Sequence, residues 1–202
     1  MSGTIDGKME KQNGSEVGFS LTIEEKRDLL KLAKQTIINR FNKSSVEEYQ
    51  PKTEIMNKKC GAFVTLHKNG DLRGCIGQIV PIDKLYIAIQ KMAIAAAFED
   101  PRFPKLKQEE LQSIDFEISV LSPFEKITNI GEIEVGKHGL MISKNMYHGL
   151  LLPQVATEYG WDRETFLKQL CRKAGLHDNA YLEPGVEILK FTAIVFGETD
   201  VS

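Results

Sequence analysis

The chain has 202 residues, of which 42% are hydrophobic and 27% charged, ordinary values for a globular protein large enough to bury a core. The formal net charge of −2 lacks the cationic excess of an extended nucleic-acid surface, so RNA binding would need a local basic groove. The sequence contains no run of about 18 apolar residues, so no membrane span is expected. Three cysteines without close spacing are typical of a reducing compartment, so we expect a cytoplasmic protein.

The amino-terminal part of the chain divides into a polar tail and a helix. Residues 1–18 are rich in Gly, Ser, Lys and Glu without apolar periodicity, and we predict that they are disordered. An ordered domain of one or two lobes is expected over 19–198. Its first helix starts at a capping box formed by Thr22 and Glu25, and its apolar residues recur at spacings of three and four.

A β-hairpin is predicted next. Two strand-like runs, 61–68 and 71–79, are separated by Asn69-Gly70, the dipeptide most typical of a two-residue hairpin turn. Uninterrupted pairing from that turn places Cys75 opposite Val64. The face expected to carry the sulfur consists of Val64, Leu66, Arg73, Cys75 and Gly77.

The remaining elements alternate between helices and strands. We predict a helix from Pro81 to Asp100, strands over 114–121 and 186–196, two or three short strands within 133–152, and helices over 153–159 and 162–174. The segment 186–196 is expected to form one long strand. Helices and antiparallel hairpins in this mixed order predict an α+β fold with a largely antiparallel sheet flanked by helices.

The segment Leu72–Gly77 (LRGCIG) is the strongest candidate site. It places a cation, a thiol and two glycines in an apolar strand, where glycine often marks the close approach of a ligand or backbone. Arg73 would favour the nucleophilic thiolate of Cys75 or bind a carboxylate or phosphate. Alternatively, Cys75 is a buried thiol that behaves as a small hydrophobe. The candidate catalytic residues are Cys75 and Arg73, and the candidate binding residues of this segment are Leu72, Gly74, Ile76 and Gly77.

Two further segments contribute candidate binding residues. The two-proline corner at 98–106 carries Asp100, Arg102 and Phe103, either as a local ion pair that fixes the loop or as the rim of a ligand site. His138 lies in a glycine-flanked turn and is either a site histidine or a solvated turn residue. Both alternatives stay open in each segment.

Several kinds of site are not expected. Cys60 would lie about 13 Å from Cys75 along the hairpin, too far for a disulfide, and Cys171 has the spacing of a core residue. The four histidines lack metal-ligand spacing, and no Walker or dinucleotide-binding motif is present, so neither a metal nor a cofactor is expected. Asp115 and Glu117 share a strand face and form either an acid–base pair or the wet side of a sheet.

Five motifs in order resemble the AMMECR domain family, and are most similar to its prokaryotic branch, the AmmeMemoRadiSam system protein A. They are LRGCIG (72–77), AAAFEDPRFP (95–104), SVLSPFEKI (119–127), VGKHGL (135–140) and LLPQVATEYGWDRETFLKQLCRKAGL (151–176). The resemblance implies a smaller second lobe and a cleft between the lobes, with LRGCIG near the cleft. It also implies site status for LRGCIG and, more weakly, for Asp100, Arg102, Phe103, Pro104, His138 and Gly139.

The family's activity is unsettled, so the resemblance leaves two main hypotheses. In the first, the protein uses Cys75 and Arg73 in a modification pathway. It would act on an unknown small or macromolecular substrate together with a radical S-adenosylmethionine protein and a Memo-like protein. In the second, it is a non-catalytic binding or scaffold module. RNA binding is a third possibility.

Overall fold

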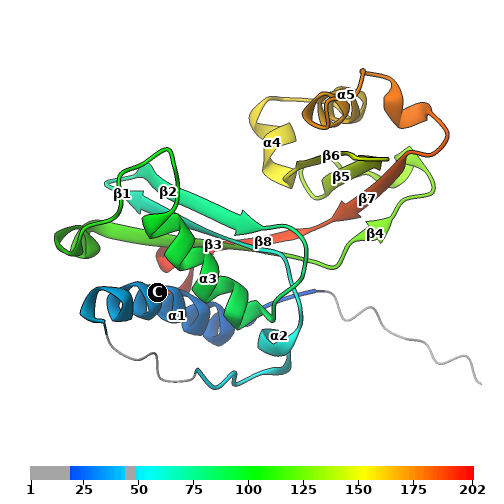
Figure 1. Ribbon diagram of the computed structural model, residues 1–202. Helices are drawn as coiled ribbons and strands as arrows, with labels where there is room; N and C mark the ends of the chain where they lie inside the picture. Colours follow the sequence, from blue (N-terminus) through cyan, green and yellow to red (C-terminus); the bar gives the residue numbers. More distant parts are fainter. Residues whose placement is uncertain (1–18, 44–48) are drawn as a thin grey trace, which may run out of the picture.

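The computed structural model describes residues 19–43 and 49–202 and shows an α+β fold in two lobes (Figure 1). The segment 1–18, expected to be disordered, lies outside the described residues. The α-helices are α1 (Ile23–Asn42), α2 (Glu54–Asn57), α3 (Leu85–Phe98), α4 (Pro153–Glu158) and α5 (Arg163–Lys173). The strands are β1 (Ala62–Lys68), β2 (Asp71–Gln78), β3 (Ile114–Leu121), β4 (Glu125–Lys126), β5 (Gly139–Lys144), β6 (Tyr147–Leu151), β7 (Glu187–Phe191) and β8 (Ala193–Gly197). The short 3-10 helices are η1 (Gln108–Ser113), η2 (Ile130–Glu132), η3 (Ala180–Leu182) and η4 (Glu198–Val201).

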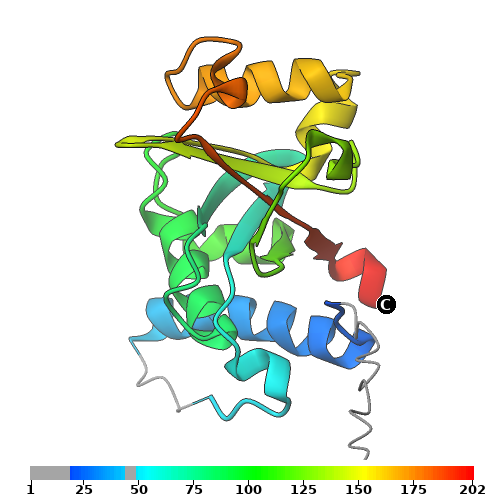
Figure 2. The ribbon, with the colours of Figure 1, turned by 90° about the vertical axis from the view of Figure 1, so that its right-hand side faces the viewer.

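The larger lobe is an antiparallel sheet of order β2-β1-β3-β8 with α1 and α3 on one face (Figure 2). The predicted capping box is confirmed: the Glu25 backbone N–H donates to Thr22 Oγ1 at 3.2 Å, and the Thr22 N–H donates to Glu25 Oε2 at 2.8 Å. Apolar side chains of α1, α3 and β1 form the core of this lobe. None of the helices in the described part of the chain has the length and apolar character needed to cross a bilayer.

The smaller lobe is a second antiparallel sheet, of order β4-β7-β5-β6, packed against α5. Asp162 caps α5 by accepting a hydrogen bond from the Thr165 N–H at 2.7 Å, and Gly175 ends the helix with a φ of +75°. Cys171 is fully buried in this core, as its spacing predicted.

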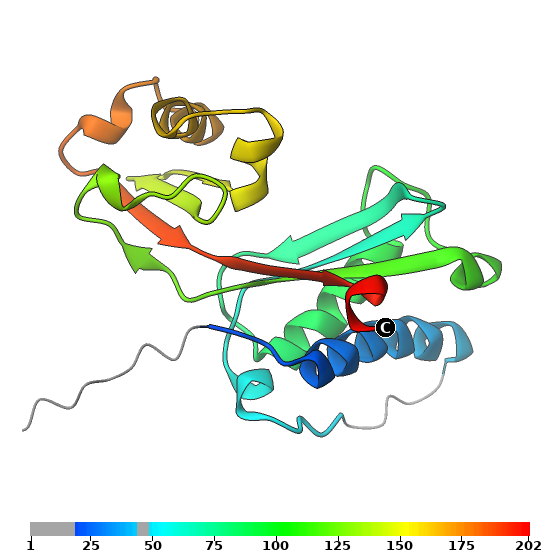
Figure 3. The same ribbon diagram turned by 180° about the vertical axis from the view of Figure 1, so that it is seen from behind.

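Two adjacent chain segments connect the lobes. The long strand predicted over 186–196 is wrong, because β7 and β8 belong to different sheets and Thr192 lies between them. Ser122, which follows β3, runs beside Thr192: the Ser122 N–H donates to the Thr192 carbonyl at 2.9 Å, and the Thr192 N–H donates to Ser122 Oγ at 2.9 Å. We call Ser122 to Phe124 together with Thr192 the interlobe crossing. Figure 3 shows the two segments, one green and one red, that run between the lobes.

The hairpin of β1 and β2 has the predicted turn but a different register. Asn69 and Gly70 have φ of +55° and +87°, as a two-residue turn of this type requires. The pairing then shifts by one residue at a β-bulge, which leaves Arg73 without a partner on β1. Beyond the bulge, Cys75 pairs with Thr65, so the expected pairing of Cys75 with Val64 is wrong.

Candidate functional site

The bulge determines which face of the sheet carries the sulfur. Because side chains alternate along a strand, the extra residue turns Gly74 toward α3 and Cys75 away from it. Cys75 is partly exposed, and the Thr65 hydroxyl donates to its Sγ at 3.3 Å. The thiol is therefore not a core group beside Val64, and it lies on the face of the sheet opposite α1 and α3.

The backbone of Cys75 is held on both sides by two residues of the two-proline corner. Its N–H donates to Asp100 Oδ2 at 2.9 Å, and its carbonyl accepts from Arg102 Nη2 at 3.0 Å. Arg102 also donates to both Asp100 oxygens, from Nε at 3.0 Å and from Nη2 at 2.8 Å. These hydrogen bonds, led by those of Arg102, hold the pKa of the Asp100 carboxyl well below its usual range. We call this pair the Asp100–Arg102 clamp.

Arg73 has a different role from the one expected for it. Its guanidinium donates from Nε and Nη2 to the two Glu110 oxygens, at 3.2 and 3.1 Å, and Lys68 Nζ also donates to Glu110 at 2.9 Å. The Arg73 side chain is only 11% exposed. Hydrogen bonding from Arg73 is the main cause that lowers the pKa of Glu110 to about 2. Arg73 thus ties the hairpin to η1, and the guanidinium that contacts the Cys75 residue belongs to Arg102.

The two glycines of the hexapeptide allow close packing on opposite faces of β2. A Cβ on Gly74 would lie 2.2 Å from the Ala96 carbonyl oxygen of α3, and one on Gly77 would lie 2.1 Å from the Phe63 ring. Each glycine is therefore required by a neighbour within the protein.

The other candidates lie around this strand. Leu72 is 42% exposed, Ile76 packs against the core, and the Phe103 ring lies beneath the Arg102 guanidinium at 5.5 Å. The structure thus brings together the hexapeptide, Asp100, Arg102 and Phe103.

His138 lies apart from this group, in the smaller lobe before β5. It is 7% exposed, and its Nδ1 accepts a hydrogen bond from the Glu134 N–H at 3.0 Å. Burial lowers the pKa of its imidazole, so the ring is neutral at pH 7. His138 is therefore a buried residue rather than a solvated turn histidine.

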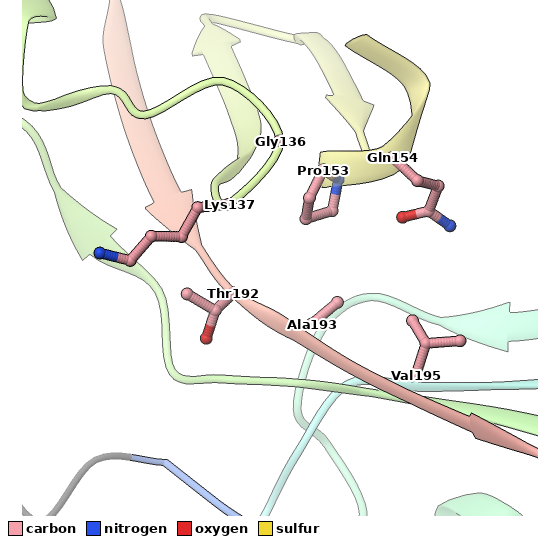
Figure 4. A pocket seen from close by; sticks show the side chains of 7 residues that line it. All are labelled: Gly136, Lys137, Pro153, Gln154, Thr192, Ala193 and Val195. Carbon is pink, nitrogen blue, oxygen red and sulfur yellow. The ribbon is translucent and has the colours of Figure 1, made fainter. Parts of the chain in front are cut away.

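Within the part of the chain that the structure describes, two cavities adjoin the interlobe crossing. The smaller, of about 420 Å³, is bounded by the Gly136 turn, Pro153 and Gln154 of α4, and Thr192 and Val195 (Figure 4). Val195 pairs with Ser119 on the same sheet face as Cys75, so this cavity opens toward that face. The larger, of about 1170 Å³, borders α2 and is lined in part by Cys60 and His138.

Sequence reasoning missed two residues of the Cys75 group, Thr65 and Glu110. Thr65 was not among the residues expected on the face that carries the sulfur, because the bulge has no signature in the periodicity. Glu110 lies in a run of exposed charges, and nothing in the pattern distinguishes it from Glu109. All three cysteines are free thiols. Within the described residues, no three potential metal ligands converge.

The comparisons with known proteins agree on one family. The AMMECR1 family model matches residues 30–196. Protein MJ0810 of Methanocaldococcus jannaschii is 44% identical over 189 residues, which cover 89% of this chain and 93% of that protein. A protein of Sulfolobus acidocaldarius is 41% identical over 88% of this chain and 83% of its own. The crystal structure of the uncharacterized protein PH0010 from Pyrococcus horikoshii superposes with a TM-score of 0.73 at 40% identity, covering 85% of this chain and 90% of that one.

Proposed function

The chain belongs to the AMMECR1 family, and from this premise we propose that it performs thiol chemistry at Cys75 as one component of a modification pathway. Its partners would be a radical S-adenosylmethionine protein and a Memo-like protein, which the likeness to the prokaryotic branch supports. The proposal rests on the surroundings of the Cys75 sulfur. Cys75 is partly exposed, and the clamp holds its backbone in place.

Each neighbour of Cys75 has a defined part in this proposal. Cys75 is the nucleophile or the carrier of a bound group. The Thr65 hydroxyl donates a hydrogen bond to the sulfur and so fixes the direction in which Sγ points. The Asp100–Arg102 clamp positions the residue, since it contacts backbone atoms rather than the thiol. Arg73 acts indirectly by fixing β2 to Glu110.

A non-catalytic binding module is the second candidate. The observation that favours it is the engagement of Arg73 with Glu110 and of Asp100 with Arg102. Because these charges are paired within the protein, the arginine and the glycines of the hexapeptide are explained by the structure alone, without a catalytic role.

Alkylation by iodoacetamide separates the two candidates. The rate at each cysteine is followed against pH by mass spectrometry of the native protein. Cys60 and Cys171 are internal controls, because burial shields both thiols and raises their pKa. We expect Cys75 to react at least about tenfold faster than either control.

A variant tests the role of the neighbouring hydroxyl. Thr65→Val removes the hydrogen bond to Sγ and is expected to slow the alkylation of Cys75, whereas Thr199→Val, at an exposed position in η4, should leave the rate unchanged. If Cys75 stays inert until denaturant is added, thiol chemistry is abandoned in favour of the binding module.

A further inference from the structure

The larger interlobe cavity is a second site that the chemistry of Cys75 does not use. Its volume of about 1170 Å³ is somewhat above the roughly 300–1,000 Å³ that small-molecule sites commonly span, so it has room for a small molecule. Lys59 and Cys60 line it from the larger lobe, His138, Lys190 and Phe191 from the smaller lobe, and Pro123 from the crossing. We propose that this cavity binds a small molecule that carries a carboxylate or phosphate group.

The buried imidazole supplies the first argument. His138 is 93% buried, and its Nδ1 accepts the Glu134 N–H, so the proton of the neutral ring is on Nε2. Nε2 has no hydrogen-bond partner among the residues that the structure describes, and the side chain lines the cavity. The Nε2–H is thus a directional donor on the cavity wall, and a ligand oxygen in the cavity could accept its hydrogen bond.

The charges of the cavity supply the second argument. Two of the three carboxylates that line the cavity are already occupied: Glu132 accepts from the Thr128 N–H and hydroxyl, from the Asn129 N–H and from Lys190, while Glu134 pairs with Lys137. Glu125 is 72% exposed to solvent.

Some hydrogen-bond donors of the cavity, by contrast, have no partner among the described residues. Within residues 19–43 and 49–202, Lys59 takes part in no ion pair, and it lines the same cavity as the His138 Nε2–H. The unused groups on the walls are thus the His138 Nε2–H and the Lys59 ammonium, which match the oxygens of an anion, and Glu125, which lies 4.0 Å from Lys190. Phe191 and Pro123 provide apolar wall surface that an apolar portion of the same molecule could contact. Because its walls come from both lobes, a bound ligand would also hold the two lobes together.

The test is a ligand titration followed by NMR of protein with isotope-labelled histidine. The probes are phenyl phosphate and benzoate, with neutral benzamide as the matched control. We expect a saturable shift of the His138 Nε2 resonance with either anion, at a dissociation constant below about 10 mM. The resonance is identified with His138→Gln, and exposed His148 and His177 should not respond. Comparing the two anions identifies the preferred oxyanion.

Variants make the test specific. Lys59→Gln is expected to weaken binding about fivefold, whereas Lys173→Gln, at the exposed end of α5, should have no effect. Cys75→Ser should bind as tightly as the unaltered protein, so the outcome is independent of the proposed thiol chemistry. The absence of a saturable shift, an equal response to benzamide, or full affinity in Lys59→Gln would overturn the proposal.

Discussion

At the scale of single residues, Glu110 shows how one carboxylate joins distant parts of the chain. Its side chain is 13% exposed and accepts from Arg73 in β2 and from Lys68 in β1. An ion pair this well shielded and held by several hydrogen bonds contributes more than an exposed one. Removing one partner would leave the buried Arg73 charge without compensation.

Glu110→Gln is therefore expected to lower the free energy of unfolding at pH 7 by about 2 to 3 kcal/mol. The folded-state pKa of Glu110 is about 2, below its ordinary value of 4.5, so the ionised carboxylate stabilises the fold above pH 4.5. That contribution is lost as pH falls from 4.5 toward 2. Urea unfolding at pH 7 and pH 3 should show a smaller loss of stability in the variant than in the unaltered protein. Glu109→Gln, at the exposed neighbouring position, is the control and should behave like the unaltered protein.

At the scale of elements, the hairpin shows where sequence reasoning succeeds and where it stops. The turn was predictable because Asn69-Gly70 accepts positive φ. The bulge was not predictable, because apolar residues and glycines occur at both odd and even positions of β2. A shift by one residue therefore leaves the pattern of apolar residues unchanged. The contact of the clamp with Cys75 spans 25 residues and has no local signal. The family resemblance identified the hexapeptide as a candidate site, but it gave no information on which face of the sheet each side chain occupies.

Gly74 is the point where β2 touches α3 most closely. Gly74→Ala would place a Cβ 2.2 Å from the Ala96 carbonyl oxygen, and two backbones would have to separate. We expect a loss of about 2 kcal/mol or more in the free energy of unfolding, measured by urea denaturation. Gly197→Ala is the matched control in the same sheet, because its nearest neighbour would lie at 3.4 Å and its φ is −120°. Equal stability of the two variants would refute this account of Gly74.

At the scale of the whole molecule, the interlobe crossing was the feature least visible in the sequence. Thr192 favours extended backbone as strongly as its neighbours, so nothing marked the point where β7 ends and β8 begins. The change of sheet arises from the pairing of Ser122 with Thr192, 70 residues apart. By contrast, the helix boundaries at Thr22, Asp162 and Gly175 were predictable because capping is local.

Ser122→Ala removes the hydroxyl that accepts the Thr192 N–H. We expect amide hydrogen exchange at Thr192 to accelerate about fivefold, corresponding to the loss of roughly 1 kcal/mol for one hydrogen bond. Ser122→Thr retains the hydroxyl and should restore slow exchange. Unchanged exchange in Ser122→Ala would mean that this bond does not secure the crossing.

The Asp100–Arg102 clamp has a further consequence, because β2 is an edge strand. An edge strand exposes N–H and C=O groups that invite a strand of another copy to add to the sheet. At Cys75 both groups are already engaged, one by a carboxylate and the other by a guanidinium. The clamp therefore acts like one residue of a neighbouring strand and disfavours edge-to-edge self-association there. The same two side chains that position the thiol thus protect the solubility of the sheet that carries it.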